Sequence, residues 1–108
     1  MSELADKQRR FCWMIGQLIQ FAFNNGMALR FACAKCAKVG HHKINSLHYE
    51  GLAIDFNLDM RGPDGKWRWC EDTLSHKVIG EFWETIGGSW GGRFDDGNHY
   101  SLEYQGRK

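Results

Sequence analysis

Four polar side chains in the sequence have the types and order of a metal-dependent hydrolytic site. His48, Asp55 and His99 are placed where side chains are otherwise buried or the chain turns. Imidazole nitrogen and carboxylate oxygen both bind Zn²⁺, and a catalytic zinc takes three protein ligands and leaves one position for water. Asp96 lies three residues before His99. A carboxylate beside an activated water can take its proton and pass it to a leaving amine. These residue types would supply the ligands of a zinc hydrolase and, in Asp96, a carboxylate able to act as its base.

The spacing of the first two candidate ligands requires a bend in the chain between them. Seven residues separate His48 from Asp55, and on a continuous strand an odd step puts two side chains on opposite faces. Gly51 lies between them and offers a place for a bend or bulge that brings them to one side. A single His or Asp is more often an ordinary hydrogen-bonded residue than a ligand, so the spacing alone does not establish the site.

The hydrophobic pattern predicts an α+β fold with a small antiparallel sheet and helices packed on it. Cys33 to Ser46 is expected to be a short helix or loop. Along the second helix, Val78, Phe82 and Ile86 are expected to form the apolar row, which leaves His76 on the surface. Two helices and four strands are expected in chain order: helix 2–25, strand 27–31, strand 52–60, a turn at 62–65, strand 66–70, helix 72–86 and strand 99–104.

Composition bounds the class of protein. The chain has 108 residues, which suit a single domain spanning 1–108 with no separate wall-binding domain, and monomer is the default. With a net charge of +1, the chain is not expected to bind nucleic acid through general electrostatic attraction. Apolar stretches are too short to span a bilayer, and Met1 to Arg10 has no signal-peptide core. We therefore expect synthesis in the cytoplasm, with no stable membrane insertion.

Two stretches resemble the signatures of a known zinc peptidase family. Residues 46–55, SLHYEGLAID, resemble the pattern S-x-H-x-x-G-x-A-x-D, and residues 96–99, DGNH, match D-x-x-H. The family comprises D-alanyl-D-alanine carboxypeptidases and phage L-alanyl-D-glutamate endopeptidases, which share a fold with hedgehog signalling domains. Residues 90–103 look like the phage endopeptidase branch, and the resemblance extends over roughly residues 28–104.

The resemblance implies a role for each site residue. His48, Asp55 and His99 would hold zinc, Asp96 would be the general base, and Arg30 would steady the substrate carbonyl or its oxyanion. The implied activity is that of a phage endolysin that hydrolyses the L-alanyl-D-glutamate bond of peptidoglycan stem peptides. Such an enzyme is made in the host cytoplasm and acts in the periplasm or cell wall after a separate pore-forming protein releases it.

Three other interpretations remain open from the sequence. A D,D-carboxypeptidase would release terminal D-alanine and would need a dedicated cation for the free carboxylate. A binding module with a vestigial zinc site would have no need of Asp96. A zinc knuckle of Cys33, Cys36 and His41 would bind nucleic acid, but Ser46 stands where its fourth ligand should be.

The remaining cysteines and tryptophans are expected to be mostly structural. Cys12 and Cys70 look like small core residues. Most of the tryptophans are expected in the core, with one or two free to line a groove for sugar or peptide; those considered are Trp67, Trp69, Trp83 and Trp90.

Overall fold

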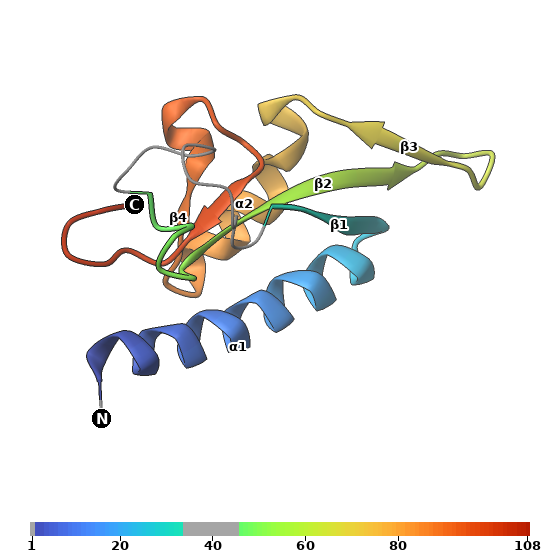
Figure 1. Ribbon diagram of the computed structural model, residues 1–108. Coiled ribbons are helices and arrows are strands. Elements are labelled where there is room, and N and C mark those ends of the chain that lie inside the picture. Colours follow the sequence, from blue (N-terminus) through green and yellow to red (C-terminus); the bar gives the residue numbers. More distant parts are fainter. Residues whose placement is uncertain (1, 34–45) are drawn as a thin grey trace.

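The computed structural model describes residues 2–33 and 46–108, and within these ranges a pair of helices accompanies a five-stranded antiparallel sheet (Figure 1). The predicted α+β class is confirmed. The predicted element at Cys33 to Ser46 lies almost wholly outside the described residues. The elements are α1 (Glu3–Asn24), β1 (Met27–Cys33), β2 (Ala53–Arg61), β3 (Trp67–Cys70), the 3-10 helix η1 (Thr73–His76), α2 (Lys77–Thr85), β4 (Ser89–Trp90), the 3-10 helix η2 (Gly91–Phe94) and β5 (His99–Ser101).

The sheet is organised around β2, and its strand order is β1-β2-β5-β4. One edge of β2 pairs with β1. The other edge pairs with β5 along Ala53–Asp55 and with β3 along Leu58–Arg61. Phe56 and Asn57 fall between these two ladders, so the sheet has a gap on this edge. Phe56 keeps one bond there, because its backbone N–H donates to the Asn98 carbonyl at 2.9 Å.

The first helix begins and ends as the sequence predicts. The Ser2 hydroxyl accepts a hydrogen bond from the Ala5 amide at 2.9 Å and caps the helix. Gly26 follows its end with φ of 76°, a conformation in which glycine carries no steric penalty. One face of the helix is buried at spacings of three and four residues, at Phe11, Met14, Leu18 and Ala22.

Both helices contribute to one core against one face of the sheet. Phe11 of α1 meets Trp83 of α2 edge to face at 5.8 Å. Phe21 and Phe82 stack with their ring centroids 4.1 Å apart. The sheet side chains that join this core alternate along the strands and include Ile54, Phe56, Leu58 and Tyr100. Asp55, Asn57 and Asp59 point to the other face, because side chains alternate along a strand.

The register of the second helix differs from the prediction. Asp72 caps η1, with its carboxylate accepting from the Ser75 amide at 3.0 Å. A 3-10 turn has three residues per turn rather than 3.6, so it rotates the α-helix that follows. The buried row therefore contains Ile79 and Trp83, while Val78 is 53% exposed. The prediction for Val78 is wrong, and so is the surface placement of His76, which is fully buried.

Two further expectations about the core are corrected. Trp83 and Trp90 are buried, but Trp67 and Trp69 are 46% and 58% exposed, because neither α1 nor α2 extends over the β2–β3 hairpin (Figure 1). Cys12 is exposed and Cys70 half-buried, so neither is a core residue. No described helix combines the length and the apolar character that crossing a membrane requires.

Candidate metal centre

His48 reaches the site from a tight turn that precedes β2. The Gly51 amide donates to the His48 carbonyl at 3.2 Å, and the Leu52 amide donates to the Leu47 carbonyl at 3.0 Å. These two bonds, together with φ of 70° at Gly51, form the motif that ends a helical turn with a left-handed glycine. Leu47 and Leu52 are both buried beneath it. The bend predicted at Gly51 is confirmed, and it turns His48 toward β2.

Asp55 and His99 are direct cross-strand partners on β2 and β5. Opposite residues of an antiparallel pair point to the same face, so the pairing of these strands places the carboxylate beside the imidazole. The Asp55 Oδ1 atom lies 3.3 Å from His99 Nδ1 and also 3.3 Å from His48 Nε2. The ligand atoms of the three residues all lie within 4.8 Å of one another. The structure therefore brings the predicted ligand set together from distant parts of the sequence.

The geometry fits a bound cation. Atoms that bind tetrahedral zinc at about 2.0–2.1 Å lie roughly 3.3–3.4 Å from each other, which is the spacing on both sides of Asp55 Oδ1. That oxygen is buried and has no hydrogen-bond partner of good geometry, a costly arrangement unless a cation satisfies it. Burial disfavours the charged form of Asp55 and so raises its pKa. Hydrogen bonds and favourable charge interactions with the imidazoles of His48 and His99 outweigh this effect and hold the pKa of Asp55 well below its usual range.

Asp96 lies at the edge of this cluster. Its Oδ2 atom is 4.0 Å from His99 Nδ1, and its side chain is 52% exposed. The segment that carries it is fixed at both ends, because its amide donates to the Gly91 carbonyl at 2.9 Å and its carbonyl accepts from the His99 amide at 3.0 Å. The Trp90 indole also donates to the Gly97 carbonyl at 2.8 Å. A carboxylate is thus held beside the metal ligands and remains open to solvent.

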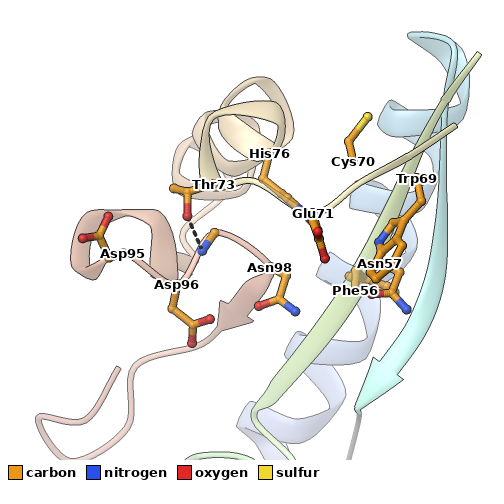
Figure 2. Close-up of a pocket in the computed structure, with 11 residues that line it drawn as sticks. Phe56, Asn57, Trp69, Cys70, Glu71, Thr73, His76, Asp95, Asp96 and Asn98 are labelled. Carbon is orange, nitrogen blue, oxygen red and sulfur yellow. Dashed lines mark hydrogen bonds between the residues drawn. The ribbon is translucent and has the colours of Figure 1, made fainter. Parts of the chain in front are cut away.

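Two glycines allow this segment to pack so closely. A Cβ atom on Gly91 would meet the Asp96 carbonyl oxygen at 2.2 Å. A Cβ atom on Gly97 would meet the Thr73 backbone at 2.5 Å. The Gly97 amide instead donates to the Thr73 hydroxyl at 3.2 Å (Figure 2). These contacts hold the Asp96 segment against η1.

A pocket of about 270 Å³ opens beside Asp96 at the gap in the sheet. Asp96 and Asn98 lie on one side of it, with Asn57 and Trp69 on the other (Figure 2). The pocket also reaches His76, whose Nδ1 lies 2.7 Å from the buried hydroxyl of Tyr100. No lysine or arginine is found among the described residues that line it. A peptide chain placed in the pocket would run past the carboxylate of Asp96.

Arg30 lies on the face that carries the ligands but is engaged elsewhere. On β1 it pairs with Asn57, two residues along β2 from Asp55. Its Nε and Nη2 atoms donate to the two carboxylate oxygens of Asp59, at 2.6 and 2.9 Å. The side chain is 54% exposed. The structure gives the Arg30 guanidinium a bidentate partner in Asp59. Its contact with a substrate carbonyl therefore stays a prediction.

The sequence reasoning missed the polar residues that border the site. Asn57 follows Asp55 by two residues, so the strand period already places it on the same face. Asn98 and His76 carry no comparable signal, because they meet the pocket only through the gap between β3 and β5. Trp69 is one of the tryptophans expected to be available for a groove, and it lines this pocket. Of the rival zinc knuckle, Cys36 and His41 lie outside the described residues.

Two imidazoles and a partly buried carboxylate that converge on one point, with a second carboxylate in reach, form a possible metal site of the kind that metallopeptidases use. Comparison with known families agrees. Residues 39–102, more than half of the chain, match the family described as D-alanyl-D-alanine carboxypeptidase. The chain belongs to this metallopeptidase family, whose substrates are peptides of peptidoglycan. No curated protein gives a significant match.

Proposed function

We propose that the chain is a zinc-dependent peptidoglycan peptidase of the phage endolysin type, which hydrolyses the L-alanyl-D-glutamate bond of stem peptides. The observation that carries the proposal is the convergence of His48, Asp55 and His99 within 4.8 Å in a chain of this peptidase family. The donor set of two imidazoles and one carboxylate suits zinc, with one position left for water.

The residues of the chain divide the chemistry between them. His48, Asp55 and His99 would hold the zinc, which when bound lowers the pKa of a water molecule and polarises the carbonyl under attack. Asp96 accepts the proton of the attacking water and then donates it to the amine of the leaving fragment. Its exposure on the pocket side and its 4.0 Å separation from His99 Nδ1 suit both transfers. Arg30, if released from Asp59, supplies donors for the oxyanion.

The choice of bond is supported by two features. Residues 90–103 resemble the phage endopeptidase branch. In addition, an exopeptidase must hold a free terminal carboxylate, and the described lining of the pocket offers no lysine or arginine for it. An endopeptidase needs no such cation.

The test is digestion of purified peptidoglycan with the zinc-loaded protein, followed by mass spectrometry of the new termini. New N-terminal glutamate supports the proposal. Digestion that yields no new termini with folded, zinc-loaded protein overturns it. Because the segment that carries Asp96 is fixed by backbone bonds, an Asp96→Asn variant should stay folded and serves as the inactive control.

A second candidate is a D,D-carboxypeptidase, which the description of the matching family favours. In that case the same digestion releases free D-alanine and leaves the L-alanyl-D-glutamate bond intact. The same assay therefore separates the two candidates.

A further inference from the structure

The face of the sheet that carries the metal ligands continues onto the β2–β3 hairpin, which projects beyond the helices (Figure 1). Trp69 pairs with Asp59, and Trp67 pairs with Arg61. Asp59 and Arg61 follow Asp55 by four and six residues, so all of these side chains point to the same face. Trp67 and Trp69, here named the aromatic strip, are 46% and 58% exposed.

The aromatic strip lies within reach of a substrate held at the metal centre. With a rise of about 3.3 Å per residue, Asp59 is about 13 Å along β2 from Asp55, and Arg61 about 20 Å. Trp69 also forms one wall of the pocket beside Asp96. A ligand that leaves the pocket along β2 therefore passes over Trp69 and then over Trp67.

Polar and charged groups surround both rings. The ion pair of Arg30 with Asp59 lies beside Trp69, and the Arg61 guanidinium lies 5.5 Å from the centre of the Trp67 ring. A lipid surface or a second copy of the chain would favour a continuous apolar patch with few charges. A sugar instead presents C–H faces that stack on aromatic rings and hydroxyl and acetamido groups that need donors and acceptors at the rim.

We propose that the aromatic strip binds amino-sugar units of the glycan strand to which the stem peptide is attached. This proposal rests on the proposed function for the identity of the substrate. An extended peptide spans about 3.5 Å per residue, so a sugar four residues from the bond at the metal centre lies about 14 Å away, level with Trp69. A sugar attached nearer to the bond, as in the proposed substrate, reaches the strip through the next units of the glycan strand. The β2–β3 hairpin thus binds the glycan strand, while the metal centre binds the stem peptide.

Binding is tested on the zinc-loaded protein with two ligands that carry no stem peptide to hydrolyse, peptide-free glycan strands and a soluble tetramer of N-acetylglucosamine. The wild type should bind both, and the double variant Trp67→Ala/Trp69→Ala should bind at least tenfold more weakly. Trp67→Phe/Trp69→Phe should keep most of the affinity because the rings remain. Trp13→Ala is the matched control, since Trp13 is 59% exposed but lies on α1.

Turnover tests the coupling of the strip to the site. The ratio of kcat/KM for a sugar-bearing muropeptide to that for the sugar-free peptide should fall about tenfold in the double alanine variant. It should be unchanged in Trp13→Ala. Equal glycan binding by wild type and double alanine variant, or an equal loss on both peptides, overturns the proposal. If no peptidoglycan bond is cut but glycan binding still depends on the two rings, the proposed function fails and the sugar site stands.

Discussion

Neighbouring carboxylates on the same turn have different surroundings, and this difference supports the proposal that Asp96 is the base. Asp95 has a left-handed φ of 62° and ends η2, whereas Asp96 faces His99 with its Oδ2 atom 4.0 Å from the ring nitrogen. Both line the pocket. Of the two, Asp96 is the one with a carboxylate oxygen within 4.0 Å of a ring nitrogen of a proposed ligand.

Asp96→Asn should keep its metal and lose at least about 100-fold in kcat, because general acid–base catalysis contributes about 10²–10⁴-fold. The measurement is steady-state hydrolysis of a muropeptide together with metal content. Asp95→Asn, which removes the adjacent charge and tolerates a positive φ, should stay near wild-type activity. Wild-type activity in Asp96→Asn would reject the assignment of the base.

His76 predicts a pH dependence of stability. Burial lowers the pKa of His76 to about 4, against the opposing charge of Asp72, while an unfolded histidine titrates near about 6.5. Between these values the unfolded chain binds more protons than the folded one. The free energy of unfolding should therefore decrease as the pH falls from about 6.5 toward about 4, by up to about 1.4 kcal/mol per pH unit.

Urea unfolding between these pH values, with chelator present throughout, measures this slope. His76→Gln removes the titrating group and should give a shallower slope even if the variant is less stable at every pH. Parallel curves for the wild type and His76→Gln would contradict the prediction.

At the scale of single residues, the chemical types of the side chains predicted the candidate site better than the hydrophobic pattern predicted which side chains are buried. The types and order of His48, Asp55, Asp96 and His99, together with the family motifs that contain them, predicted a cluster whose candidate metal ligands the structure brings together. The burial of His76 could not be predicted, because it depends on whether the turn at Thr73 winds with three or 3.6 residues. Whether this turn is 3-10 or α-helical depends on packing against the Asp96 segment, and the local sequence carries no information about that packing.

Among the elements, the turn before β2 determines where His48 points. Gly51 takes φ of 70°, and its two flanking bonds close the turn over Leu47. A residue with a side chain would carry a steric penalty in this conformation and would loosen the turn.

Gly51→Ala should reduce the free energy of unfolding by about 1–2 kcal/mol and also weaken metal binding, because His48 precedes the strained residue by three positions. Gly65→Ala is the matched control. Gly65 also has a positive φ, 79°, but lies at the tip of the hairpin, so its substitution should cost similar stability without changing metal affinity. Competition with a chromogenic chelator measures the affinity. Equal affinities in the two variants would show that the turn does not position His48.

The helix α1 and the strands β2, β3 and β5 were predicted from the sequence, whereas β4 and η2 were not. The alternation along β2 and the caps of α1 extend over enough residues to show a period. The two-residue β4 and the four-residue η2 are too short to show one. β4 forms because the neighbouring β5 supplies its partners, and the chain after η2 is fixed by the bond from the Trp90 indole to the Gly97 carbonyl.

Across the whole molecule, the metal centre joins segments that are distant in sequence. Its ligands come from the turn before β2, from β2 itself and from β5. A cation held by all three stabilises the folded chain, because the unfolded chain offers no such site.

Removal of zinc by a chelator should therefore lower the Tm of the wild type. At a metal concentration about 1,000 times the Kd the stabilisation is about 4 kcal/mol. His99→Ala should have a low Tm with or without chelator. Scanning calorimetry of both proteins measures this, and a wild-type melting curve that is unaffected by chelator would argue against a tightly bound ion.

The pairing of β2 with β5 has a consequence for the timing of synthesis. Asp55 meets His99 only across that ladder, so a nascent chain on the ribosome has an incomplete coordination sphere until the codon for His99 has been translated and the strand has emerged. A product truncated before His99 would therefore lack one of the three proposed ligands, and the proposed site would require nearly the whole chain.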